Sequence, residues 1–177
     1  MKIFALVLSL LLAPASAHSA DVASADLPGY VDFSALADEY GEARVTINLS
    51  GSILGLVASL KHDNPAASET LKNLDSVRVQ VYDTAGNTSA AASRMDAVSG
   101  KLMNAEWEQV IRVREAGERV HVFMKQGDNR IKGLMIMAVD PEEAVFINIL
   151  GDIDPAHLET VVSQMNVVGN IDLDLSL

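Results

Sequence analysis

In the first half of the chain, segments with an apolar residue at every second position alternate with segments of helical apolar spacing. This pattern predicts strands separated by helices. Every second residue is apolar in Ala43–Leu49 and again from Val77 to Val81, which is typical of half-buried strands. Between these strands, Ser50 or Ser52 can cap a helix. The apolar residues of this helix recur at helical spacing, at Ile53, Leu54, Leu56, Val57 and Leu60.

Two further helices are expected beside the second strand. Asn64-Pro65 is expected to end the first helix, and a shorter helix is expected over 66–74. The segment Thr88–Asn104 is rich in alanine, although Gly100 weakens its last turn. It carries an apolar stripe at Ala91, Met95, Val98 and Leu102, which predicts an amphipathic helix over the whole segment.

Four strand candidates follow in close succession, at Trp107–Arg114, Arg119–Lys125, Arg130–Val139 and Ala144–Leu150. Only a few turn-forming residues join them, and such short connections require antiparallel neighbours. The last two strands are apolar on both faces, which places them at the centre of a sheet. We therefore predict an α+β fold: an antiparallel sheet of about six strands, ending in a four-stranded meander, with two to four helices packed on it.

A last helix and an alternating tail are predicted after the meander. Asp154 supplies an N-cap oxygen, Pro155 fits the first helical position, and Gly169 suits the end of the helix. Its apolar stripe is Leu158, Val161, Val162 and Met165. In the tail, Ile171–Leu177, every second residue is apolar. We expect this tail to be an edge strand of the sheet, and the alternative is a segment that pairs with the sheet edge of a partner.

The first twenty residues have the layout of a cleavable export signal. Lys2 precedes a short apolar run, and the small residues Ala15 and Ala17 suit cleavage after residue 17, with Ala20 as the second choice. The run spans about ten residues, half of what a membrane-spanning helix needs, so no stable membrane anchor is expected. The predicted organisation is a signal peptide over 1–17, a flexible leader over 18–29, one α+β domain over 30–169 and the tail or edge strand over 170–177.

Composition limits the cellular compartments and the kinds of partner that are expected for this chain. The chain contains no cysteine, which excludes disulfides and a lipid-modified cysteine. The formal net charge is −11, and loss of Lys2 with the signal peptide makes the mature chain one unit more negative. Such a field repels nucleic acid and favours basic partners. We therefore expect a periplasmic or secreted protein that is not lipidated, that binds no nucleic acid and that has an envelope protein or an apolar ligand as its partner.

No motif indicates catalysis, a cofactor or a metal, so no catalytic, cofactor-binding or metal-binding residue is assigned. The histidines, His18, His62, His121 and His157, lack the spacing of metal ligands. Glu106 with Glu108 and Glu142 with Glu143 are expected to be solvated acids at strand ends and turns. Asp128, Asn129, Asp152 and Asp154 lack the spacing of a calcium loop. Trp107 is expected to anchor an edge of the core.

Three methionines offer the one soft-ligand alternative. Met135 and Met137 lie two residues apart on one strand, and Met124 lies on the preceding strand, so their thioethers could converge on Cu(I). Methionine is also a common filler of core gaps, and this is the favoured interpretation.

The region from Trp107 to Asp154 resembles an uncharacterised bacterial family, the domain of unknown function 4252. The matching segments are Trp107, Val110–Val113, Val120–Phe123 with Lys125, Ile131–Leu134, Ile147–Ile149 and Gly151–Asp154. The resemblance implies a small exported domain, often lipidated, with no assigned activity. The absence of cysteine departs from the lipidated pattern.

These observations favour a non-enzymatic binding or interaction module in the cell envelope. The alternative is a hydrolase whose carboxylates come together from distant segments. A methionine-based copper carrier is the minor alternative.

Overall fold

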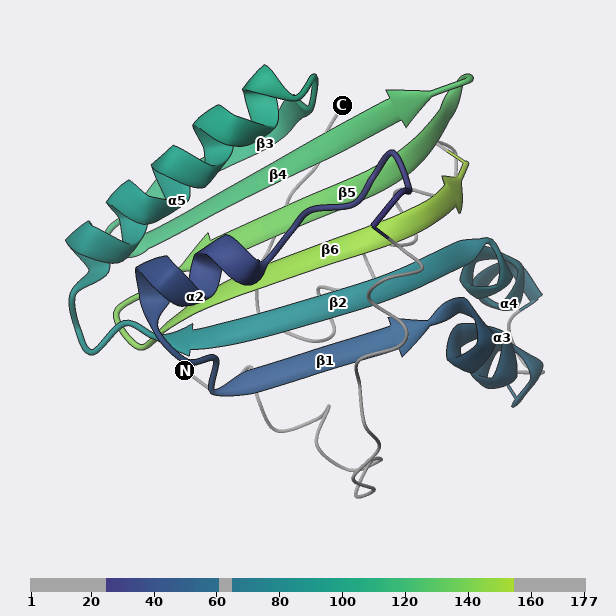
Figure 1. The fold of residues 1–177 in the computed structure, drawn as a ribbon, viewed down its shortest axis with the longest axis horizontal. Coiled ribbons are helices and arrows are strands. Elements are labelled where there is room, and N and C mark those ends of the chain that lie inside the picture. The colour runs from purple at the N-terminus through teal and green to yellow at the C-terminus, as the bar shows by residue number, and fades with distance from the viewer. Residues whose placement is uncertain (1–24, 61–64, 155–177) are drawn as a thin grey trace.

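One six-stranded antiparallel sheet organises the fold (Figure 1). The computed structural model describes residues 25–60 and 65–154, so the predictions for the signal peptide, the last helix and the tail lie outside the described residues. The strands are β1 (Val45–Ser50), β2 (Leu74–Asp83), β3 (Glu108–Glu115), β4 (Glu118–Gly127), β5 (Arg130–Val139) and β6 (Glu143–Ile153). Their order in the sheet is β1-β2-β6-β5-β4-β3.

The predicted meander is confirmed, because β3, β4, β5 and β6 are neighbours in sequence and in the sheet. β5 and β6 are central, and β3 is an edge strand. The connection from β4 to β5 consists of Asp128 and Asn129, whose φ angles are 54° and 58°. Positive φ at both residues of a two-residue loop matches the right-handed twist of a hairpin, and this explains why aspartate and asparagine occur there.

Within the described residues, four helices lie around the sheet: α2 (Ser34–Tyr40), α3 (Gly51–Leu60), α4 (Pro65–Lys72) and α5 (Thr88–Asn104). Three of them follow the predictions, and α5 has the predicted bounds. α2 was not predicted, because its seven residues are too few to show an apolar period. It begins after Asp32, which accepts hydrogen bonds from both the backbone N–H and the hydroxyl of Ser34 at 2.8 Å. No helix in the described part of the chain is long and apolar enough to cross a membrane.

The prediction for α3 was wrong about which face is buried. Leu54 is buried at 3% exposure, whereas Ile53, Leu56 and Leu60 are among the exposed large hydrophobic residues. The reason is the position of the helix: α3 and α4 lie at one end of the sheet rather than across it (Figure 1). α3 therefore contacts the core along one narrow line, through Leu54 and Ala58.

α2, α5 and the segment before α2 cover one face of the sheet (Figure 1), which we term the helix-covered face. Its core is rich in aromatic residues. Tyr82 and Phe146 lie with their ring centroids 5.9 Å apart, and the ring of Tyr40 in α2 lies within 5.3 Å of both. Met95 of α5 is fully buried against this cluster. The predicted stripe of α5 is confirmed, because Ala91, Met95, Val98 and Leu102 are all buried.

Candidate functional site

The opposite face of the sheet is apolar over three central rows of cross-strand neighbours, apart from one glutamate at the β3 edge. The middle row runs straight across all six strands, from β1 to β3, and consists of Ile47, Val79, Ile147, Ile136, Val122 and Ile111. The row on one side is Val45, Val81, Val145, Ala138, Val120 and Val113. The row on the other side is Leu49, Val77, Ile149, Leu134 and Met124, and it reaches Glu108 on β3.

We term these seventeen apolar residues the aliphatic face. Alternation along each strand produces it, since every second side chain points to the same side of a sheet. A face of this composition is the kind that a sheet buries against another layer. Among the described elements, only α3 and α4 approach it. Leu54 and Leu71 pack at the end formed by Leu49, Val77 and Ile149, which leaves the middle row without a described helix above it.

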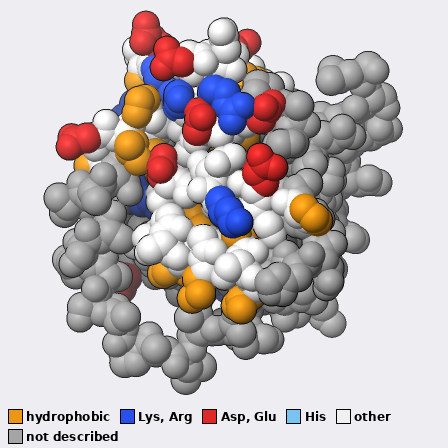
Figure 2. Space-filling view, turned by 90° about the vertical axis from the view of Figure 1, so that its right-hand side faces the viewer, with side chains coloured by type: hydrophobic (Ala, Val, Ile, Leu, Met, Phe, Trp, Pro, Cys, Tyr) orange, Lys and Arg blue, Asp and Glu red, His pale blue; other side chains and the backbone are white. Residues whose placement is uncertain are grey.

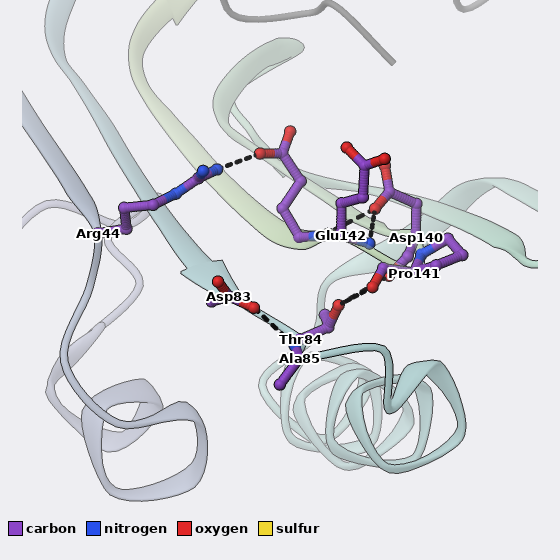
Figure 3. Close-up of polar contacts among 8 residues, drawn as sticks. Arg44, Asp83, Thr84, Ala85, Asp140, Pro141 and Glu142 are labelled. Carbon is purple, nitrogen blue, oxygen red and sulfur yellow. Dashed lines mark hydrogen bonds and ion pairs between the residues drawn. The ribbon is translucent and has the colours of Figure 1, made fainter.

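The aliphatic face is bordered by charge where β5 turns into β6. Glu143 precedes Val145 by two residues, and alternation places it on the same side of the sheet. Its carboxylate is paired with the guanidinium of Arg44, which extends toward this turn in Figure 3. Burial raises the pKa of Glu143, and the Arg44 charge opposes that shift. Glu143 is therefore an acid in a structural ion pair, not the solvated acid that the sequence predicted.

Hydrogen bonds fix this turn and the neighbouring connection from β2 to α5 (Figure 3). The Thr84 hydroxyl donates to the carbonyl of Pro141 at 2.7 Å, and Asp83 Oδ1 accepts the N–H of Ala85 at 2.6 Å. Asp140 Oδ1 accepts the N–H of Glu142 at 2.7 Å. These acidic side chains are engaged with backbone donors, so their clustering has a structural cause.

The opposite end of the sheet carries interspersed acidic and basic side chains (Figure 2). Lys132 Nζ lies 2.7 Å from Asp152 Oδ1, and Arg130 Nη1 lies 2.8 Å from Asp154 Oδ2. Both carboxylates are thus paired with cations. No group of three or more potential metal ligands occurs among the described residues.

The helix-covered face contains a small cleft between α2 and α5, with a volume of about 220 Å³. Trp107 and Met135 line its base, and the ion pair of Lys101 with Glu39, at 3.5 Å, lies beside it. Trp107 is only 6% exposed, which confirms the prediction that it anchors the core. Small-molecule sites usually enclose about 300–1,000 Å³. The cleft is smaller than this, so the aliphatic face is the stronger candidate.

The segment before α2 is held on the helix-covered face by two buried polar residues. Asn148 is fully buried; its Oδ1 accepts the N–H of Val31 at 3.1 Å, and its Nδ2 donates to the carbonyl of Gly29 at 3.0 Å. Arg78 donates to the carbonyl of Val31 at 2.7 Å. Gly29 lies so close to β5 that a Cβ atom there would meet the Lys132 carbonyl oxygen at 2.2 Å. The last residues of the predicted leader therefore pack tightly where the predicted domain begins.

Ser99 and His121 form the only Ser–His contact in the described part of the chain, with Ser99 Oγ 2.9 Å from His121 Nδ1. Both side chains are buried, at 4% and 1% exposure. The Ser99 hydroxyl also donates to the carbonyl of Met95 at 2.9 Å. Burial, reinforced by the charge of Arg112, lowers the pKa of His121. Neither residue lines the cleft, so the pair joins α5 to β4 in the buried core.

The three methionines of the copper alternative do not converge. Met124 pairs with Leu134 on the aliphatic face. Met135 pairs with Phe123, and it lies with Met137 in the aromatic core on the other side of the sheet. Met135 and Met137 are fully buried. The prediction that they fill the core is thus confirmed, and the convergence of all three thioethers is wrong, because strand alternation separates Met124 from the other two. His121 is the one histidine within the described residues.

The aliphatic face was not recognised from the sequence. Its signal was present in the alternation of Val45, Ile47 and Leu49 and of Val77, Val79 and Val81. The later strands are apolar on both faces, and which of their residues continue these rows depends on the register of β2 with β6.

A six-stranded antiparallel sheet with helices on one face defines a small α+β domain. Comparison with protein families then gives its membership. The family model described as a domain of unknown function, DUF4252, matches residues 40–161, which is more than half of the chain. The protein belongs to this family. No curated protein and no solved structure matches the chain.

Proposed function

We propose that this protein is an exported, non-enzymatic binding module and that its aliphatic face receives an apolar surface of an envelope protein. The observation that supports this proposal is the unbroken row of aliphatic side chains across six strands, with described helices at one end of the face only. Burial of apolar surface contributes roughly 25 cal/mol per Å². A face of this kind therefore provides the main driving force for association.

The charge of the chain defines the surroundings of the partner's apolar surface. The net charge of −11 favours a partner with basic groups around its contact surface. The partner's cations would meet acidic groups such as Glu108, which lies at the β3 end of one row. The export signal predicted over residues 1–17 supports a location in the envelope.

The chemistry of the described residues supports binding rather than catalysis. Glu143, Asp152 and Asp154 are held by cations, and the Ser99–His121 pair is buried away from the cleft. A hydrolase needs acids or a nucleophile in contact with a substrate. The Ser99–His121 pair is closed to solvent, and the exposed carboxylates of Asp152 and Asp154 are engaged by cations.

The test compares partner affinity between matched variants of the mature chain. The partner is captured from an envelope fraction, identified by mass, purified and titrated against each variant. Ile136→Thr combined with Ile147→Thr places two hydroxyls in the contact while retaining β-branched side chains. We expect Kd to rise at least about tenfold, because each unpaired hydroxyl costs on the order of 1 kcal/mol to desolvate.

Val110→Thr is the matched control. Val110 is an exposed residue in the β-bulge of β3, outside the three rows, and its substitution should leave Kd unchanged. Circular dichroism and thermal unfolding establish that each variant is folded. Equal affinity of the folded double variant and the native chain would refute the proposed surface. Recovery of Met1 by N-terminal sequencing of the native protein would refute export.

A further inference from the structure

We infer that the C-terminal segment of this chain, residues 155–177, covers part of the aliphatic face in the free protein, so that a partner must displace it. The displacement step rests on the proposed function, whereas docking of the segment does not. The inference identifies a regulatory contact of the binding surface within the same chain.

The position of β6 delivers the segment to the centre of the sheet. β6 lies between β2 and β5, and its last residue, Ile153, packs in the core beside α3. Asp154 is tied to Arg130 at the start of β5. The segment therefore starts in the middle of one end of the sheet, from which it can return over either face.

Only one of these two faces lacks a described helix across its centre (Figure 1). The helix-covered face already carries α2, α5 and the segment held by Asn148 and Arg78 (Figure 1). The aliphatic face carries described helices only at the end where β6 finishes. An additional amphipathic element has its largest apolar contact there.

The length and chemistry of the segment fit this face. It has 23 residues, and the helix predicted to end near Gly169 would be about 20 Å long at 1.5 Å per residue. The three rows extend over roughly 13 Å along the strands, at about 3.3 Å per residue. The predicted stripe is aliphatic except for one methionine, like the face itself: Leu158, Val161, Val162 and Met165. The family model also extends beyond β6, to residue 161.

The width of the sheet makes this cover incomplete. Six strands spaced about 4.8 Å apart span roughly 24 Å, whereas a helix with its side chains is about 10 Å wide. One helix therefore covers about two strands. A partner can bind the remaining strands first and then compete with the segment for the covered ones.

Cysteine cross-linking tests this arrangement directly, because the native chain contains no cysteine. The mature chain receives one cysteine on the face and one on the predicted stripe, Ile147→Cys with Val162→Cys, and is treated with a bis-maleimide of about 10 Å. The control pair is Ser93→Cys with Val162→Cys, because Ser93 is exposed on α5 on the other side of the sheet. We expect at least five times more intramolecular product from the first pair. Equal yields, or products that link two chains, would overturn the inference.

A labelling rate provides a second measurement that does not depend on cross-linker geometry. In the single variant Ile147→Cys, Val161→Asp with Val162→Asp should undock the segment and raise the rate of maleimide labelling about tenfold or more. Thr160→Asp with Ser163→Asp introduces the same charges on the opposite side of the predicted helix and should leave the rate unchanged. If Ile147→Cys does not fold, Val79→Cys in the same row replaces it. An unchanged rate in the undocking variant would exclude the segment as the cover.

Failure of this inference is distinguishable from failure of the proposed function. Docking is measured on purified protein without a partner, and affinity is measured with one. If the segment docks but the face variants bind the partner normally, the proposed function fails and the intramolecular cover stands. If the face variants lose the partner but no cross-link forms, the binding surface stands and the cover fails.

Discussion

The two faces of the sheet are built by opposite chemistry. The helix-covered face mixes aromatic rings with buried polar side chains, and each of its central polar residues has a specific partner: Asn148 holds Gly29 and Val31, and His121 contacts Ser99. The aliphatic face has only hydrocarbon in its middle row. The same six strands thus present one face that depends on hydrogen bonds of fixed direction. Their other face depends on apolar contacts, which have no fixed direction.

This difference indicates which face keeps one fixed covering layer and which face can exchange the layer that covers it. A buried hydrogen bond is costly to leave unmade, so a surface that depends on such bonds accepts one arrangement of neighbours. Burial of hydrocarbon depends on area more than on direction, so an aliphatic surface tolerates several occupants. The contrast fits a permanent cover on the helix-covered face, and it supports the proposal that the aliphatic face exchanges its occupants.

The largest expected effect comes from removing an aromatic side chain of the helix-covered face. Phe146→Ala leaves a cavity against Tyr40 and Tyr82 and should lower the free energy of unfolding by about 3–5 kcal/mol, measured by urea denaturation. Val145→Ala on the same strand removes a half-buried residue of the aliphatic face and should cost about 1–2 kcal/mol. Similar losses for the two variants would contradict the contrast between the faces.

The next effect concerns the polar residue that fixes the segment before α2. Asn148→Ala removes the partners of the Val31 N–H and the Gly29 carbonyl and should cost about 2–3 kcal/mol. The Val31 amide should also exchange with deuterium much faster than in the native protein. Asn48 lies on the same face in the edge strand β1, and Asn48→Ala should cost under about 1 kcal/mol. Protection of Val31 that survives Asn148→Ala would show that the segment is held by other contacts.

The pH dependence of the free energy of unfolding should reveal the contribution of His121. Its pKa is lowered in the folded protein, chiefly by burial and then by Arg112, so the unfolded chain binds the proton more readily. Stability should therefore fall as the pH drops below about 6.5, the pKa of an exposed histidine, and the loss should be complete below the folded pKa. Urea denaturation between pH 7.5 and 5 measures it. His121→Gln should flatten the profile in this window; if its slope equals that of the native chain, another group is responsible.

Local patterns in the sequence were sufficient for most of the fold. α5 and the meander were predictable because helical spacing in Thr88–Asn104 and short turns after residue 106 need no distant information. The buried position of Trp107 was predictable from its large, mostly apolar ring at the start of the meander. The class of fold follows from these elements once the helices are placed on one sheet.

Long-range contacts were not predictable. Asn148 holds residues that lie 117 and 119 positions earlier in the chain, and no local period reports such a contact. The aliphatic face requires the register of β2 with β6, which pairs Val79 with Ile147. The alternative in which Met124 and Met135 converge failed for the same reason, since a register decides which residues share a face.

The smallest expected effect tests the charged border of the aliphatic face. Arg44→Gln leaves the Glu143 carboxylate buried without its cation, and we expect a loss of about 1 kcal/mol at pH 7, because Arg44 is half exposed and solvent screens the pair. Glu143→Gln removes the charge that burial disfavours and should be close to neutral. The pKa of Glu143 is already raised, and loss of Arg44 should raise it further. The cost of Arg44→Gln should therefore shrink as the pH falls and Glu143 takes up its proton. Urea denaturation of both variants at pH 7 and pH 5 measures this, and a cost independent of pH would mean that Arg44 acts through packing of its side chain rather than through its charge.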